Sequence, residues 1–169
     1  MSGAHEPVSM EVVGVRVELP SNQPIVLLKE THGSRYLPIW IGGNEATSIA
    51  TALEGVVPPR PLTHDLMRSV LDSVGALPAR ITITEMRDSV YFADLAIDHE
   101  GRDIHISCRP SDAIAIAARC GTPVFALPSV LDEAGIEFED DSEDDEVSRF
   151  RRLLEEVTVE DFLGGESAE

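Results

Sequence analysis

The sequence predicts an α+β domain with a mainly antiparallel sheet or sheets and three packed helices. Apolar residues make up 43% of the 169 residues, which is enough to form the core of one domain of ordinary size. Short segments with strand patterns are joined by turns, and three segments with helical spacing lie among them. We therefore expect a single compact domain over residues 1–135, followed by an acidic linker and a short helix over residues 136–169.

Three strands are predicted near the N-terminus. Apolar and polar residues alternate from Met10 to Leu19, which is typical of a half-buried strand. Further strands are predicted over Ile25 to Lys29 and over Arg35 to Ile41, because turn-forming residues at 20–24 and 32–34 separate these segments. Such short links favour antiparallel hairpins.

Two helices are predicted next. The first begins at Asn44, a good N-cap residue, and ends at Gly55. The connector after it contains two adjacent prolines, which can continue neither helix. Thr63 then caps the second helix, whose apolar residues we expect to be buried: Leu66, Met67, Val70, Leu71 and Val74.

The second half of the domain again has strands followed by a helix. Strands are predicted over Ala79 to Met86, Val90 to Ile97 and Asp103 to Ser107, with turns between them. The segment from Pro110 to Cys120 predicts a third helix, since proline is favoured in a first turn and Ser111 can cap. A short apolar strand, Pro123 to Leu127, completes the predicted core.

The formal charge of −18 is concentrated in the C-terminal tail. Residues 132–169 contain 16 acidic residues and three arginines, whereas residues 1–131 contain 15 acidic and ten basic residues. We expect the acidic run from Glu137 to Glu146 to be solvated and disordered, and Val147 to Val157 to form the short helix. No basic cluster is present, which counts against extended nucleic-acid binding but is compatible with a cleft that engages one or two phosphates.

The sequence also indicates the compartment. No apolar run approaches the roughly 18 residues that a membrane span requires, so we expect no membrane partner. The first ten residues lack the basic and apolar regions of a secretory signal. Cys108 and Cys120 are too few for a disulfide framework and form no CxxC motif, which favours a reducing, cytoplasmic setting without a zinc finger.

Two helix starts combine residues of the kind that bind phosphate. Arg60 and Arg109 each precede a proline, and Asp65 and Asp112 follow in the first turn of the respective helix. Arginine can contact phosphate oxygens in a bidentate manner, and helix N-termini favour anions. His64 can act as a general acid or base near neutral pH. The same residues also have a purely structural interpretation, as caps and as charges that offset the helix dipole.

Four carboxylates near these helix starts offer hard oxygen ligands for Mg²⁺ or Mn²⁺: Glu45, Glu54, Asp65 and Asp112. Together with the arginines and His64, they are the parts of a phosphodiester-cleaving site in which a divalent ion activates water. These residue types are common, and the chain contains no HExxH, P-loop or GxSxG motif.

Three segments, in this order and at these spacings, carry a resemblance to a known family: LPIWIGGNEA (Leu37 to Ala46), ALEGVVPPRPLTHDL (Ala52 to Leu66) and RPSDAIAIA (Arg109 to Ala117). They resemble the bifunctional nuclease family, also called domain of unknown function 151. The resemblance covers about residues 8–135. It implies a compact α+β domain, often oligomeric, with nuclease activity on both DNA and RNA.

The matching positions imply a set of site residues. The resemblance suggests His64, Asp65 and Asp112 as catalytic residues, Arg60, Arg109 and Ser111 as substrate-binding residues, and Glu45, Glu54, Asp65 and Asp112 as metal ligands. The function predicted is that of a metal-assisted nuclease of low sequence specificity, in a homo-oligomer with a dimer favoured. The alternative is a non-enzymatic binding or regulatory module whose polar helix starts are structural or hold a small anion.

One position departs from the family pattern. Members often have an acidic residue two positions before the arginine of the RPSDA segment, where this chain has Ser107. If that acid is a metal ligand, this chain has one ligand fewer.

Overall fold

The computed structural model, which describes residues 6–138 and 154–156, confirms the predicted α+β class. The first three strands are β1 (Val8–Glu18), β2 (Gln23–Glu30) and β3 (Arg35–Trp40). β1 pairs with β2 and β2 with β3, both antiparallel, as the short turns between them predict. Their inward-facing side chains, among them Val26, Leu28, Leu37 and Ile39, are fully buried or nearly so.

A second antiparallel unit is formed by β4 (Ala76–Arg87), β5 (Val90–His99) and β6 (Arg102–Cys108). The short strand β7 (Val124–Ala126) joins the two units, because it pairs antiparallel with β1 and parallel with β4. The resulting sheet has the order β6-β5-β4-β7-β1-β2-β3, and β8 (Ile136–Glu137) adds to β3 at one edge.

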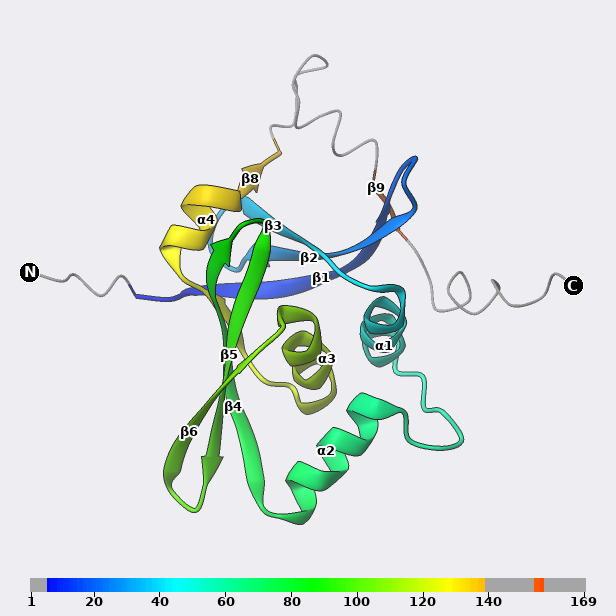
Figure 1. The fold of residues 1–169 in the computed structure, drawn as a ribbon, viewed down its shortest axis with the longest axis vertical. Coiled ribbons are helices and arrows are strands. Elements are labelled where there is room, and N and C mark those ends of the chain that lie inside the picture. Colours follow the sequence, from blue (N-terminus) through cyan, green and yellow to red (C-terminus); the bar gives the residue numbers. More distant parts are fainter. Residues whose placement is uncertain (1–5, 139–153, 157–169) are drawn as a thin grey trace, which may run out of the picture.

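The three predicted helices are α1 (Gly43–Leu53), α2 (Thr63–Ser73) and α3 (Pro110–Cys120). They lie on one side of the molecule, in the angle between the two strand units (Figure 1). α3 is central, since it packs against α1, α2, β4 and β5. Residues 113–117 of α3, which alternate alanine and isoleucine, are almost fully buried. Packing on several sides explains this run of small and branched side chains.

All three helices begin earlier than the predicted caps imply: α1 and α3 begin before the predicted cap residue, and α2 begins at it. The predicted N-cap residues Asn44, Thr63 and Ser111 lie inside the helices, and the N-cap positions belong instead to Gly42, Leu62 and Arg109. Each of these has an extended backbone conformation and no side-chain cap. In α2 the carboxylate of Asp65 accepts a hydrogen bond from the backbone N–H of Leu62 at 2.9 Å, so the acidic first-turn residue provides the cap.

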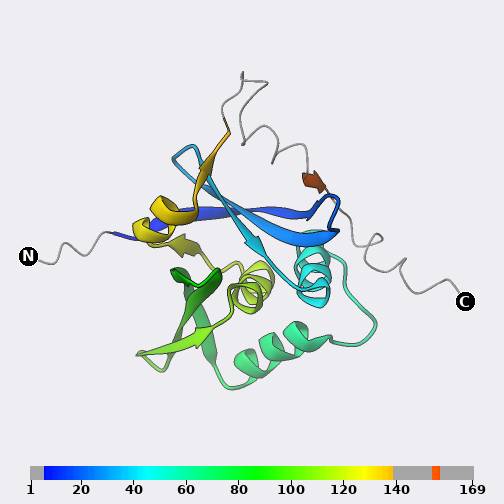
Figure 2. The ribbon, with the colours of Figure 1, turned by 45° about the horizontal axis from the view of Figure 1, so that its top comes forward.

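The predicted burial of the apolar residues of α2 is wrong for four of the five, while Leu71 is partly buried. Leu66, Met67, Val70 and Val74 are between 40% and 57% exposed, and His64 is the one buried residue of this helix. The reason is that α1 and α3 already cover this side of the sheet, so that α2 lies outside them (Figure 2). Four of its apolar side chains line a cavity, and of these only Leu71 also packs against the core.

The C-terminal part differs from the prediction in two respects. A fourth helix, α4 (Pro128–Ala134), follows β7 and packs on β3 and β4. Of the helix predicted over 147–157, the structure describes only β9 (Leu154–Glu156), which pairs antiparallel with Arg16–Glu18 of β1. β7 pairs with only the first residues of β1, so the rest of that edge offers unpaired backbone groups for β9. The acidic run is outside the described residues from position 139 onward.

Candidate functional site: a polar cluster at the first turns of three helices

The first turns of α1, α2 and α3 meet at one end of a cavity of about 1250 Å³. The polar residues that line this end come from all three helices: Asn44, Glu45, Thr47, Ser48, Thr63, His64, Arg109 and Asp112. The remaining wall is largely aliphatic and belongs to α2, α3, β5 and β6. Segments that are up to 68 residues apart in the sequence, from Asn44 to Asp112, therefore form one site.

His64 is held by a hydrogen bond at each ring nitrogen. Its Nδ1 lies 2.7 Å from Ser48 Oγ, and its Nε2 lies 2.9 Å from Asp112 Oδ1. The histidine is only 8% exposed and Ser48 only 6%. Because an ionised carboxylate can only accept, Nε2 of the neutral ring carries the proton, and Nδ1 accepts the hydroxyl proton of Ser48.

Arg109 bridges two carboxylates at the mouth of the cavity. Its Nε donates to Asp112 Oδ2 at 2.8 Å, and its Nη2 donates to Glu45 Oε1 at 3.0 Å. Burial raises the pKa of Asp112, but the hydrogen bonds from Arg109 and His64 outweigh this effect and hold the pKa below its usual value. Asp112 is therefore ionised at neutral pH, and it accepts from a different partner at each oxygen.

The structure brings together four of the predicted site residues and separates the other four. Glu45, His64, Arg109 and Asp112 line the cavity, whereas Glu54, Arg60, Asp65 and Ser111 do not. Glu54 is the C-cap residue of α1, at the opposite end of that helix from Glu45. Ser111 is buried, and Arg60 is exposed on the loop between α1 and α2, directly before Pro61 at the cavity wall.

Asp65 belongs to a separate ion pair. Its Oδ1 accepts from Arg119 Nε at 2.7 Å, and its Oδ2 accepts from the N–H of Leu62. The side chain of Arg119 is only 5% exposed and also donates to the carbonyl of Ala115 at 2.9 Å. Burial raises the pKa of Asp65, but Arg119 and the N–H of Leu62 lower it by more. Both oxygens of Asp65 are thus occupied in joining α2 to α3.

The donor set at the mouth of the cavity fits a divalent cation of the Mg²⁺ type. In the described residues, no group of three or more His, Cys, Asp or Glu is arranged as a complete metal site. However, Glu45 and Asp112 already share one positive group, the guanidinium of Arg109, and both present hard oxygens to it. Mg²⁺ is commonly bound by one or two carboxylates together with water and substrate phosphate. The arrangement suits an ion that takes the place of this guanidinium.

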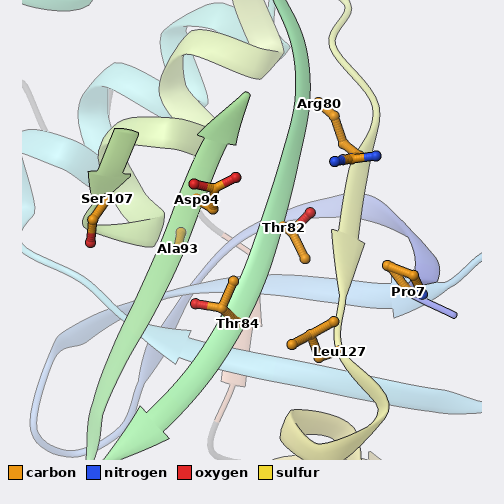
Figure 3. A pocket seen from close by; sticks show the side chains of 8 residues that line it. All are labelled: Pro7, Arg80, Thr82, Thr84, Ala93, Asp94, Ser107 and Leu127. Atoms are coloured by element: carbon orange, nitrogen blue, oxygen red, sulfur yellow. The ribbon is translucent and has the colours of Figure 1, made fainter. Parts of the chain in front are cut away.

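Ser107 lies on the other face of the sheet. Its neighbours Ile106 and Cys108 line the cavity, and side chains of a strand alternate between faces. Ser107 instead borders a second, shallower pocket together with Asp94 of β5 and Thr82 of β4 (Figure 3). The departure from the family pattern at this position therefore removes no ligand from the Glu45–Asp112 cluster.

The sequence interpretation missed Ser48 and Arg119. Ser48 follows Asn44 by four residues and Glu45 by three, so helical spacing alone places it on their face of α1. Arg119 follows Asp112 by seven residues, which places both on one face of α3. Those spacings were available in the sequence, but the partners of both residues come from α2, whose position is a property of the tertiary structure.

The arrangement can be compared with known proteins. The model of the bifunctional nuclease domain matches residues 26–139. The chain belongs to this family. The match includes every residue of the cluster at the mouth of the cavity, most of β2, the strands β3 to β8 and the four helices that the structure describes.

Relatives in the bifunctional nuclease family fall into two groups. An uncharacterized protein of Mycobacterium tuberculosis is 44% identical over 161 residues, which cover 90% of this chain and 96% of the relative. Bifunctional nuclease 1 of rice (Oryza sativa subsp. japonica) is 31% identical over 103 residues, covering 59% of this chain and 31% of the relative. Bifunctional nuclease 2 of Arabidopsis thaliana is 30% identical over 112 residues, covering 63% and 34%. This chain spans about a third of each plant protein.

The helices that the structure describes are short, none exceeding eleven residues. Within residues 6–138 and 154–156, none is long and apolar enough to cross a membrane.

Proposed function

We propose that this member of the bifunctional nuclease family is a metal-assisted nuclease of low sequence specificity that acts on DNA, RNA or both. The observation that supports this proposal best is the cluster of Glu45, Arg109 and Asp112 beside His64. It places two carboxylates, a cation and a histidine at the mouth of one cavity. The names of the plant relatives describe nucleases and agree with this class of reaction.

In this proposal Glu45 and Asp112 hold Mg²⁺ or Mn²⁺ in place of the Arg109 guanidinium. Such an ion, when bound, activates a water molecule and neutralises charge on the phosphate. Arg109, whose side chain is 65% exposed, is free to turn outward and contact a phosphate oxygen. Arg60 is exposed next to the cavity wall and is placed to contact a neighbouring phosphate. Contacts of this kind carry no base information, which accounts for the low specificity.

His64 is the group that would exchange a proton with the substrate. Its bonds to Ser48 and Asp112 hold the imidazole in one orientation, which favours proton transfer in a defined direction. Asp65 is not part of this machinery, since it does not line the cavity and instead joins α2 to α3 through Arg119. Glu54 and Ser111 have no role in it either, because they do not line the cavity.

The proposal is tested with the purified full-length chain and single-stranded RNA and DNA, in Mn²⁺, in Mg²⁺ and in EDTA. We expect degradation in either metal ion and none in EDTA. His64→Ala should lower the rate by about 100-fold or more, the range found for the loss of a general acid or base. His32→Ala, an exposed histidine in the turn between β2 and β3, is the matched control and should keep the full rate. Equal rates for both variants would refute the assignment of His64.

The competition between Arg109 and the metal ion gives a prediction that does not depend on activity. Arg109→Gln should bind Mn²⁺ about tenfold more tightly than the unaltered protein in titration calorimetry, because one positive charge leaves the carboxylate pair. Arg102→Gln, which removes an exposed arginine paired with Glu100 at 3.4 Å, serves as the control. Unchanged Mn²⁺ affinity in Arg109→Gln would contradict the shared position of guanidinium and metal ion.

One observation favours the second candidate function, a non-enzymatic binding or regulatory module. Every carboxylate oxygen named in the cluster already accepts a hydrogen bond from the chain itself. Such a closed network is a feature of structural ion pairs as well as of resting active sites. This candidate predicts no turnover in any metal ion and a lower melting temperature for Arg109→Gln. Activity and thermal melts of that variant together distinguish the two functions.

We further propose that the protein self-associates, with a dimer as the simplest state, and that it acts in the cytoplasm. The exposed apolar residues of α2 support self-association, because burying them against a second copy would remove apolar surface from water. The two cysteines are both unpaired thiols, which agrees with a reducing compartment. Light scattering of the protein as it elutes from a size-exclusion column measures its mass directly, and the mass of a monomer would refute the proposed self-association.

A further inference from the structure

Ser48, His64 and Asp112 form a hydrogen-bonded chain, and the nuclease proposal gives the hydroxyl of Ser48 no chemical role. It joins the middle of α1 to the start of α2 and the first turn of α3 through bonds of 2.7 and 2.9 Å. A hydroxyl, an imidazole and a carboxylate in this sequence are the parts of an activated nucleophile: a base within reach of the hydroxyl, oriented by a third group. Such a constellation is recognised by geometry and roles and not by sequence position.

The directions of the hydrogen bonds suit that role. Asp112 accepts the Nε2–H of His64, so that the lone pair of Nδ1 is directed at the Ser48 hydroxyl. The two ring nitrogens are used in the opposite sense to the serine proteases, where Nε2 faces the serine. Either nitrogen of imidazole can serve as the base, so the exchange of the two does not alter the chemistry.

The cavity beside Ser48 is apolar beyond its polar end. Its aliphatic wall combines exposed side chains of α2 and β6, such as Leu66 and Ile106, with buried ones of β5 and α3, such as Leu95 and Ile116. Among the described residues no Phe, Tyr or Trp lines it, although nucleobases are usually bound by stacking on aromatic rings. Phosphodiester cleavage beside Glu45 and Arg109 leaves this aliphatic wall without a role. A volume of about 1250 Å³ is ample for a small apolar ligand.

The buried end and the apolar wall together indicate a substrate class. We propose that the same cavity hydrolyses carboxylic esters of apolar acids, with Ser48 as the nucleophile, His64 as its base and Asp112 as the residue that orients His64. The acyl group would lie along the aliphatic wall. Asn44, one helical turn before Ser48 on the same face, and Arg109 both line the polar end and would donate to the developing oxyanion.

The reaction is complete without an additional reactant other than water. Ser48 Oγ attacks the carbonyl carbon as its proton passes to His64 Nδ1, and the tetrahedral intermediate expels the alcohol, which takes that proton from His64. Water then attacks the acyl-serine with His64 again as base. The carboxylic acid leaves, and the proton returns to Ser48 Oγ. No oxidant, reductant or metal ion takes part.

The role of Ser48 as nucleophile is tested with a fluorophosphonate probe, which forms a phosphonate ester with an activated serine as fluoride leaves. The full-length protein should be labelled in EDTA, and mass spectrometry of the digested protein should locate the adduct on Ser48. It should also hydrolyse p-nitrophenyl butyrate and p-nitrophenyl octanoate, at a rate about 100-fold lower in Ser48→Ala. Ser69→Ala, which removes a hydroxyl bonded to the Asp65 carbonyl on α2, is the matched control and should change neither result.

The outcomes separate this proposal from the nuclease proposal. Labelling of Ser48 in the unaltered protein requires no variant to fold, so a destabilised Ser48→Ala does not obscure the test. An unlabelled Ser48, or ester hydrolysis equal in Ser48→Ala and Ser69→Ala, would overturn the inference. Because EDTA removes the metal-dependent reaction, ester hydrolysis in EDTA without nuclease activity in Mn²⁺ would support this inference and refute the other.

Discussion

Asp65→Ala is expected to lower the free energy of unfolding by about 3 kcal/mol, the lower end of the cost of removing one partner of a buried ion pair. The substitution leaves the guanidinium of Arg119 buried at 5% exposure, with its hydrogen bond to the carbonyl of Ala115 retained. It also removes the carboxylate that accepts from the N–H of Leu62 at the start of α2. For a domain of this size, that loss corresponds to a melting temperature lower by roughly 10 °C.

Urea denaturation at pH 7 measures this effect, and Asp72→Ala is the matched control. Asp72 is on the same helix and pairs with Arg68 at 3.7 Å, but both side chains are more than half exposed. Such a pair contributes about 0.5 kcal/mol or less. Comparable stability of the two variants would mean that Asp65 is not a structural residue. If Asp65→Ala then proved to be inactive as well, the predicted role of Asp65 as a metal ligand would be restored.

The stability lost in Asp65→Ala should depend on pH. The pKa of Asp65 is lowered in the folded protein, so its contribution is complete above the pKa of an unfolded aspartate, about 3.9. That contribution is lost as the pH falls through the lower pKa that Asp65 has in the folded protein. The difference in the free energy of unfolding between the unaltered protein and Asp65→Ala should therefore be constant near neutral pH and shrink in acid below about pH 4. A difference that grows in acid would contradict the ion pair.

The fold was largely predictable from local patterns. The two features that were not, the exposed side of α2 and the strand β9, both depend on tertiary structure. Strand alternation and turn residues predict the β1–β2–β3 and β4–β5–β6 units, because antiparallel neighbours are joined by short local links. The exposed side of α2 was not predictable, since its amphipathic pattern is the same whether it faces a core or an open cavity. The strand β9 depends on an open edge of β1 that no local pattern describes.

The candidate site was predictable in residue type but not in pairing. Arginine, histidine and aspartate at two helix starts indicated a polar site, and the structure unites His64, Arg109 and Asp112. The two aspartates looked equivalent in sequence, each in the first turn after an arginine and a proline. Their roles differ because Arg119 reaches Asp65, while His64 reaches Asp112. That distinction arises from the crossing of α2 and α3, which involves residues 54 positions apart in the chain.

Asp112→Asn is expected to lower the nuclease rate by about 100-fold or more while the fold is retained. Asparagine has the shape of aspartate, and its oxygen can still accept from His64 Nε2, so the contact at 2.9 Å is kept. The negative charge is lost, however, and with it the ion pair with Arg109 and one of the two carboxylates proposed to bind the metal ion. We expect Mn²⁺ binding in titration calorimetry to weaken in parallel with the rate.

Asp88→Asn is the matched control for this prediction. Asp88 is exposed in the turn between β4 and β5 at φ of 51°, a conformation that asparagine adopts readily, so neither rate nor Mn²⁺ affinity should change. Full activity of Asp112→Asn would remove Asp112 from the proposed machinery. A large loss of rate with unchanged Mn²⁺ affinity would assign the effect of Asp112 to its negative charge beside His64. The nuclease and ester reactions would then depend on the same residue for the same reason.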